Sequence, residues 1–234
     1  AALERELVGR GLAFTPHEVD VADAAAVQRL ADAVYDADGR VDVLHNNAGL
    51  VVGGEVQNLS LDDWRLAVDV NLMGVIHGIH AFVPRMILQA GGGHVVNTSS
   101  VAGLLGFPVM GPYSATKFAV VGLSEALDAE LGAHDIRVTA LCPGMVRTNV
   151  LDGGHLTLPG NGVELLRKLF GRLANTPEQV AEEVLAIVRK RRGGIRTVGL
   201  GTRQMWLARR GSVAAYQALM RGVSRQVLGG RKGR

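Results

Sequence analysis

The sequence has one cysteine, few aromatic residues and few prolines. Among its 234 residues are one Cys, seven Pro and 4% Phe, Trp or Tyr. The lone Cys142 excludes an internal disulfide framework and fits a reducing compartment. The shortage of aromatic residues argues against an aromatic-rich binding surface. With 47% hydrophobic residues and 31 glycines, the composition instead predicts one folded α/β domain rather than a disordered chain.

Acidic residues are absent from the C-terminal part of the chain. The last one is Glu183, and 184–234 contains thirteen Lys or Arg residues and no Asp or Glu. Residues 1–183 contain the remaining twelve basic residues and all 22 acidic residues, which gives this part a net charge of −10. The sequence therefore predicts an acidic body and a basic tail.

We find no apolar run long enough to cross a bilayer, so we expect no membrane-spanning helix. The first residues, Ala1 to Glu4, match neither a signal peptide nor a natural start. They are typical of the middle of a helix, and we expect the natural polypeptide to extend upstream.

Short apolar runs alternate with longer segments of helical periodicity. We expect strands at 12–19, 41–45, 94–98, 137–141 and 195–200, and helices beginning near Asp23, Ser60, Tyr113 and Thr176. Strands that alternate with helices of this length pair in parallel through right-handed crossovers. The sequence thus predicts a doubly wound, three-layer α/β/α sheet of the Rossmann type. We assign 1–200 to a single catalytic domain and 201–234 to a basic helical extension.

Several short motifs occur in a fixed order over the first 150 residues. They are Asp20-Val21, Asn46-Asn47-Ala48-Gly49, Asn71, Ser100, Tyr113 with Lys117, and Pro143-Gly144 with Thr148. Each motif is weak alone, but their shared order and spacing exceed what chance would produce. In these motifs the chain resembles the short-chain dehydrogenase/reductase family, which moves hydride between NAD or NADP and an alcohol or carbonyl.

Tyr113 and Lys117 are four residues apart near the start of a predicted helix, so their side chains leave the same face. A free tyrosine, with a pKa of about 10, is too weak a base at neutral pH, and a nearby cation lowers that pKa by stabilising the phenolate. The pair therefore predicts a general acid/base, Tyr113, and a cation, Lys117, that lowers its pKa. An exposed helix pair is the better interpretation of these two residues alone, but the other motifs outweigh it.

The resemblance implies two further catalytic residues, Ser100 and Asn71. Ser100 lies thirteen residues before Tyr113 and would bind the substrate oxygen, whereas for Ser99 we expect only a turn hydrogen bond. Asn71 would open its helix locally and hold a water that links to Lys117. The alternative for Asn71 is an exposed or self-bonded helical asparagine.

The resemblance also implies where the dinucleotide binds, at the carboxyl ends of parallel strands. Asp20 and Val21 would face the adenine, the turn 47–49 the ribose, and the loop 143–148 the nicotinamide. The implied cofactor-binding residues are Asp20, Val21, Asn47, Ala48, Gly49, Tyr113, Lys117, Pro143, Gly144, Val146 and Thr148. For Asn46 we expect a structural role between adjacent strands.

The family's glycine-rich turn, which holds the pyrophosphate at a helix N-terminus, should precede Asp20 by some tens of residues. Only nineteen residues precede Asp20 and none of them forms this turn, so we expect the first β-α-β portion upstream of Ala1. Gly199-Leu200-Gly201-Thr202 lies at the wrong end of the chain to replace it. The residue that determines the preference for NAD or NADP lies in the same upstream portion. The sequence therefore predicts NAD or NADP without selecting one.

Between Ser100 and Tyr113, where the family builds its substrate pocket, the apolar residues are Leu104, Leu105, Phe107, Val109 and Met110. They favour an apolar substrate, although loop packing explains much of their character. The segment 151–175 resembles the family's mobile substrate lid. His77 and His80 are interpreted as packing or surface residues and Cys142 as a small core residue, and no metal site is predicted.

The basic tail has two interpretations. Its apolar residues between arginines are compatible with an amphipathic helix on an anionic membrane, but we favour a helix packed on the body. Nucleic-acid binding is disfavoured by the acidic body and the lack of a recognition motif, and we expect no nucleic-acid partner.

Together these features predict an NAD(P)-dependent oxidoreductase acting on a secondary alcohol or ketone, and they favour a bulky, apolar small-molecule substrate. We expect a cytoplasmic homodimer or tetramer that associates through the two long helices. The main alternative is a non-catalytic, truncated scaffold or membrane-associated binding protein. A sugar-nucleotide epimerase is disfavoured by the short region after Thr148.

Overall fold

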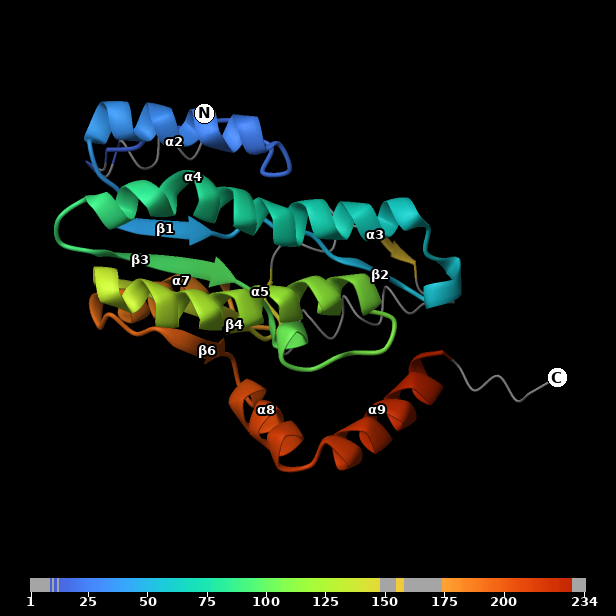
Figure 1. The fold of residues 1–234 in the computed structure, drawn as a ribbon. Helices are drawn as coiled ribbons and strands as arrows, with labels where there is room; N and C mark the ends of the chain where they lie inside the picture. The colour runs from blue at the N-terminus through green and yellow to red at the C-terminus, as the bar shows by residue number, and fades with distance from the viewer. Residues whose placement is uncertain (1–8, 10, 12, 148–154, 158–173, 229–234) are drawn as a thin grey trace.

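The computed structural model describes residues 9, 11, 13–147, 155–157 and 174–228 (Figure 1). The main sheet is parallel throughout and consists, in spatial order, of β1 (Val43–Asn46), β3 (Gly93–Thr98), β4 (Ile136–Pro143) and β6 (Gly194–Val198). The helices are α2 (Ala24–Asp38), α3 (Leu61–Val68), α4 (Gly74–Leu88), α5 (Gly111–Leu131), α7 (Pro177–Arg189), α8 (Thr202–Gly211) and α9 (Val213–Val227). Short 3₁₀ segments lie at Val56–Asn58, Val101–Gly103 and Gly132–His134.

Helices cover both faces of the sheet, as Figure 1 shows with α4 and α5 in front and α7 behind. Adjacent residues of β3 point to opposite faces: Val95 packs with α2 and α4, whereas Val96 packs with α7. Both side chains are fully buried, as expected for a parallel strand covered on both sides. The predicted three-layer, doubly wound α/β fold is therefore confirmed.

The helix starts follow the local capping residues. The Asp23 carboxylate accepts from the first backbone N–H groups of α2. Ser60 with Asp63, and Thr176 with Gln179, form reciprocal capping boxes at α3 and α7. The predicted starts at Asp23, Ser60 and Thr176 are confirmed.

The strand predicted at 12–19 is wrong for the residues that the structure describes. Residues 13–19 carry no strand assignment. A strand requires a neighbour that shares its hydrogen bonds, and among the described residues β1 pairs only with β3. Periodicity alone could not reveal whether such a neighbour exists.

The expectation that no apolar segment is long enough to cross a bilayer is wrong for the helical segment Leu61–Leu88. By length and composition it is long and apolar enough to cross a membrane, although 44% of its most apolar window is buried inside the protein. Within it, Phe82 and Met86 pack in the core with Val95. A core helix of this kind passes the same test of composition without spanning a bilayer.

A second, two-stranded parallel sheet joins β2 (Val52–Gly54) to β5 (His155–Thr157), and neither strand is predicted by the sequence. The imidazole of His155 also binds the Asp63 carboxylate at the start of α3. This hydrogen bond, together with the capping interactions from Ser60, lowers the pKa of Asp63 to about 2. Of the predicted lid 151–175, only β5 and residues 174–175 lie within the described residues.

Candidate active site

Lys117 and Tyr113 lie in the first turns of α5, which has Pro112 at its N-terminal end. Lys117 is 3% exposed, and its Nζ donates to the carbonyl oxygen of Thr98 at 2.9 Å. The same Nζ lies 5.8 Å from the centroid of the Tyr113 ring. The cation is therefore held between the end of β3 and the tyrosine.

Burial dominates the electrostatics of this pair. It lowers the pKa of Lys117 to about 8 and raises the pKa of Tyr113, while the Ser100 hydroxyl partly offsets the latter shift. The pKa of Tyr113 is thus raised, whereas its spacing from Lys117 predicts a lowered pKa. The largest effect on this pKa is the loss of water around the phenolate, and the Lys117 ammonium is not among the groups that shift it.

Ser100 and Ser99 follow β3 and have different roles in the fold. Ser100 is buried, N-caps the 3₁₀ segment Val101–Gly103, and accepts from the N–H of Ala102 at 3.1 Å. The Ser99 hydroxyl donates to the carbonyl oxygen of Lys117 at 2.7 Å. The expected turn bond for Ser99 is thus replaced by a long-range bond to α5, although its role remains structural.

Gly103 makes the close approach of Ser99 to α5 possible. A Cβ at this position would lie 2.3 Å from the Ser99 Oγ and 2.5 Å from the Lys117 carbonyl oxygen. Because both atoms are fixed by their mutual hydrogen bond, only glycine fits here.

Asn71 is fully buried within the π-helical segment Asp69–Met73, which separates α3 from α4. Its Oδ1 accepts from the N–H of Leu50, and its Nδ2 donates to the Leu50 carbonyl, both at 2.9 Å. The alternative of an exposed or self-bonded asparagine is wrong. The expected local opening of the helix is present, since a π-helical turn widens the α-helix.

Polar side chains connect the carboxyl ends of β1 and β3. The His45 ring bonds to the Thr98 hydroxyl at 2.9 Å, and that hydroxyl donates to Asn47 at 3.1 Å. Asn46 donates to Asn97 at 2.8 Å. The predicted strand-joining role of Asn46 is confirmed.

The predicted nicotinamide loop begins at the adjacent strand end. The N–H of Gly144 donates to Val198 on β6 at 2.8 Å, and Val146 forms an isolated bridge with Asn175. A Cβ at Gly144 would lie 2.9 Å from the Thr202 hydroxyl at the start of α8. Pro143 ends β4 beside β3, whereas Thr148 lies outside the described residues.

The predicted adenine-binding residues, Asp20 and Val21, lie near β1 on the side away from β3 and β4. Asp20 is exposed and accepts from the N–H of Ala22 at 2.9 Å, while Val21 contacts the start of α4 at Gly74. A hollow of about 220 Å³ is lined by Val21, Asn47 and Ala48 together with residues of α2, β1 and α4. The structure thus places Val21, Asn47 and Ala48 around one hollow.

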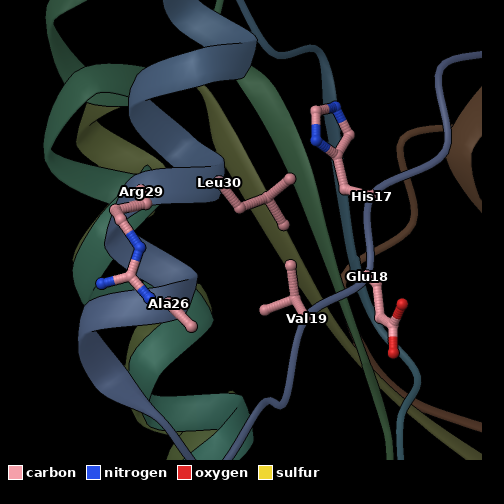
Figure 2. Close-up of a pocket in the computed structure, with 6 residues that line it drawn as sticks. All are labelled: His17, Glu18, Val19, Ala26, Arg29 and Leu30. Atoms are coloured by element: carbon pink, nitrogen blue, oxygen red, sulfur yellow. The ribbon is translucent and has the colours of Figure 1, made fainter.

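A different hollow of about 200 Å³ lies between residues 17–19 and α2 (Figure 2). Figure 2 shows the side chains of His17, Glu18 and Arg29 around it. None of the predicted catalytic residues lines it.

The residues around Gly49 fit a nicotinamide nucleotide. Residues 47–49 are exposed, and a Cβ at Gly49 would lie 3.1 Å from the Asn71 Oδ1 and 3.3 Å from the Lys117 Nζ. The turn therefore offers an open backbone beside two polar side chains, as a ribose with its hydroxyl groups requires.

The residues predicted to line the substrate pocket divide into two groups. Leu104 and Leu105 are buried in a core cluster with Cys142, so they pack rather than line a pocket. Val109 adopts a left-handed backbone with φ of 57°, and its carbonyl accepts from the N–H of Gly54 at 2.7 Å. Phe107 remains partly exposed beside the cluster.

The structural interpretations of His77 and Cys142 are confirmed. The His77 Nδ1 bonds to the Val21 carbonyl at 2.9 Å. Cys142 is buried, and burial raises the pKa of its thiol to about 12. Among the described residues, no group of three His, Cys, Asp or Glu side chains is placed to hold a metal.

Sequence reasoning missed three residues that shape the site: Thr98, Gly103 and Thr202. Thr98 and Gly103 adjoin the motif residues in sequence, but their importance lies in contacts with α5. Thr202 lies far along the chain from Gly144. No local signal marks these contacts, which only the folded chain brings together.

Comparisons with known proteins agree with this arrangement. A family model described as short chain dehydrogenase matches residues 1–154. “Probable oxidoreductase EphD” of Mycobacterium tuberculosis is 31% identical over 194 residues, which cover 80% of this chain and 33% of that protein. D-threitol dehydrogenase of Mycolicibacterium smegmatis is 40% identical over 182 residues, covering 77% of this chain and 68% of that enzyme. A crystal structure of a Burkholderia phymatum short chain dehydrogenase/reductase in complex with NAD superposes with a TM-score of 0.82 and 32% identity, covering 90% of this chain and 80% of that chain.

A parallel α/β sheet with a buried lysine and a tyrosine at its carboxyl edge defines the class of protein. The chain belongs to the short-chain dehydrogenase family. It spans about a third of the length of EphD.

Proposed function

We propose that the protein is an NAD(P)-dependent oxidoreductase that interconverts a secondary alcohol and a ketone. The observation that carries the proposal is the position of Lys117, which is buried beside Tyr113 and anchored on Thr98 at a strand end. A buried ammonium is costly and marks a functional site when it lies beside a second titratable group.

In this proposal Tyr113 transfers the proton at the substrate oxygen. During alcohol oxidation its phenolate would take the hydroxyl proton, and during ketone reduction its phenol would return it. The Ser100 hydroxyl, which partly offsets the rise in the pKa of Tyr113, would bind the same substrate oxygen. The bound nicotinamide accepts or supplies the hydride.

Lys117 would tune Tyr113 and bind the ribose. An ammonium has three donors, of which one is committed to Thr98. The others are free to contact a ribose beside Gly49, next to which the Nζ lies. Asn71 would hold the relay water, because its own amide is fixed by Leu50 in the same region.

We assign NAD or NADP to the exposed turn 47–49, the hollow that includes Val21, and the loop from Pro143. The Burkholderia phymatum relative, which is solved in complex with NAD, supports the assignment. Asp20, Val146 and Thr148 complete the proposed set.

An apolar substrate is supported by Phe107, Val109 and Met110, since Leu104 and Leu105 are committed to the core. Met110 and the Val109 carbonyl both lie against Gly53 of β2. We expect Phe107, Val109 and Met110 to contact the part of the substrate that does not react.

We further propose a cytoplasmic homo-oligomer. Apolar side chains are exposed along α3 and α4, with Leu61 at 71% and Leu88 at 86%. Burial of such residues is a common source of subunit association. Light scattering on the purified protein measures the oligomeric state directly.

Fluorescence titration of the full-length polypeptide with NADH and NADPH, followed by a dehydrogenase assay on a panel of secondary alcohols, tests the function. We expect micromolar binding of at least one cofactor and turnover that requires Tyr113. A folded, full-length protein that binds neither cofactor would support the non-catalytic scaffold instead.

A further inference from the structure

The loop 101–110, which leads from β3 to α5, carries two carbonyl groups that the last two helices bind. Arg209 of α8 donates to the Leu104 carbonyl oxygen at 2.9 Å. The Tyr216 hydroxyl of α9 donates to the Gly106 carbonyl oxygen at 2.6 Å. In Figure 1, α8 and α9 follow β6 and lie below the green loop that leads into α5. The C-terminal helices therefore hold the loop that follows the predicted catalytic serine.

The partly buried side chains of α8 and α9 face the same part of the protein. Trp206 and Tyr216 pack against the core cluster that includes Leu104. Met220 and Val223 lie four and seven residues after Tyr216, so they share its helix face, and both are partly buried. This arrangement agrees with the favoured interpretation of the tail as a helix packed on the body.

Arg209 joins three elements at once. Its guanidinium lies 5.2 Å from the centroid of the Phe118 ring on α5 and 5.6 Å from that of the Tyr216 ring on α9. An arginine over an aromatic ring is stabilised by the negative face of the ring. Together with the bond to the Leu104 carbonyl, these contacts commit the guanidinium to the loop and to the helix that the loop enters.

The far end of the loop is fixed on the other side, by β2. The carbonyl of Val109 accepts from the N–H of Gly54 at 2.7 Å, and Val109 has a φ of 57°. A β-branched residue rarely adopts this left-handed backbone, which persists only where the surroundings hold it. Phe107 lies between the two attachments and is partly exposed. The position of its ring therefore depends on both β2 and the C-terminal helices.

We propose that Arg209 and Tyr216 are positioning residues for the substrate. By holding the loop 101–110 they fix Phe107 in the wall of the substrate site, and so set a preference for bulky, apolar secondary alcohols. This inference rests on the proposed function, because it assigns the loop to the substrate site. Neither residue takes part in proton or hydride transfer. Loss of either bond should therefore raise KM rather than lower kcat, and most for a substrate large enough to need the whole wall.

Hydrogen–deuterium exchange of Tyr216→Phe tests whether α9 holds the loop. The variant keeps the ring and removes only the hydroxyl that binds Gly106. Several N–H groups of the loop donate to carbonyls of the same loop, such as that of Met110 to Phe107. We expect peptides from 101–110 to exchange about two- to tenfold faster, the effect of losing one hydrogen bond. Peptides from β3 and β4 should exchange as in the wild type.

Steady-state kinetics test the positioning role, with a bulky and a small secondary alcohol that the wild type oxidises, such as menthol and isopropanol. In Tyr216→Phe the KM for the bulky alcohol should rise by about two- to tenfold, and the KM for the small alcohol should change less. Both kcat values and the affinity for the cofactor should stay as in the wild type. Arg209→Met removes the other bond to the loop and should act in the same direction.

Tyr35→Phe is the matched control, because it removes a hydroxyl that bonds the Phe82 carbonyl, far from the loop in sequence. It should leave both loop exchange and KM unchanged, and circular dichroism should show that all variants are folded. Unchanged loop exchange in Tyr216→Phe would overturn the proposal. Equal rises in KM for both alcohols, a fall in kcat alone, or the same effects in Tyr35→Phe would also overturn it.

Failure of the proposed function would give a different result. A wild type that binds no cofactor and oxidises no alcohol would overturn the dehydrogenase proposal, and the role in substrate preference with it. Hydrogen exchange requires neither cofactor nor substrate, so it would still show whether α9 holds the loop. An active wild type whose loop loosens in Tyr216→Phe without a change in KM would overturn the positioning role alone.

Discussion

The Nζ of Lys117 donates to the carbonyl oxygen of Thr98 across 2.9 Å, which joins α5 to the last residue of β3. One bond to a carbonyl dipole compensates only part of the cost of burying an ammonium, and burial accordingly lowers the pKa of Lys117 to about 8. The proposed function therefore has a cost in stability that can be measured.

That cost should vanish as the pH rises. Between a folded-state pKa of about 8 and the ordinary value of 10.5, the unfolded chain binds more protons at Lys117 than the folded protein does. The contribution of Lys117 to the free energy of unfolding should therefore increase with pH through this window, by about 3 kcal/mol in total. Urea unfolding of the wild type and of Lys117→Met from pH 7 to pH 10 measures the effect. The wild type should gain stability relative to the variant, and parallel curves would contradict the assigned pKa.

Tyr113→Phe should remove activity without unfolding the protein. The proton transfer that the hydroxyl performs contributes about 10²- to 10⁴-fold to the rate, so kcat should fall by that factor while cofactor binding persists. Tyr35→Phe is the control, since it removes a hydroxyl that bonds the Phe82 carbonyl at 3.4 Å, outside the site. Substantial turnover by a folded Tyr113→Phe enzyme would refute the assignment of the acid/base.

Much of the fold can be predicted from the sequence because its signals are local. The caps at Asp23, Ser60 and Thr176 act within three residues of themselves. The strands of the main sheet, β1, β3, β4 and β6, lie within two residues of their predicted ends, since buried parallel strands are continuous apolar runs. The spacing of Tyr113 and Lys117 likewise fixes their shared helix face.

The errors arise where a partner far along the chain decides the outcome. Segment 12–19 has an apolar pattern but no described neighbour for pairing. Ser99 bonds to the backbone of Lys117 rather than to its own turn. The direction of the pKa shift of Tyr113 depends on burial, a property that helical spacing does not contain.

Arg209→Met should weaken the link between α8 and the loop after Ser100. Its guanidinium lies 5.2 Å from the Phe118 ring centroid and bonds the carbonyl of buried Leu104. Removal leaves that carbonyl without its donor, which costs about 1–3 kcal/mol. In an active enzyme we expect KM to rise more than kcat falls. Arg210→Met is the control, since its guanidinium is exposed over the Trp206 ring and its loss should cost less than about 1 kcal/mol. Equal effects of the two substitutions would argue against the link.

Gly103→Ala should destabilise the protein by about 1–3 kcal/mol or more, because an added methyl group forces apart atoms that are already in contact. It would meet the Ser99 Oγ at 2.3 Å and the Lys117 carbonyl at 2.5 Å. The matched substitution Gly122→Ala lies within α5, where a Cβ has nothing within 4 Å. There alanine should stabilise the helix by about 0.5–1 kcal/mol. Thermal unfolding of the two variants should therefore shift in opposite directions from the wild type. If Gly103→Ala were tolerated as well as Gly122→Ala, the close approach of Ser99 to α5 would not require glycine at position 103.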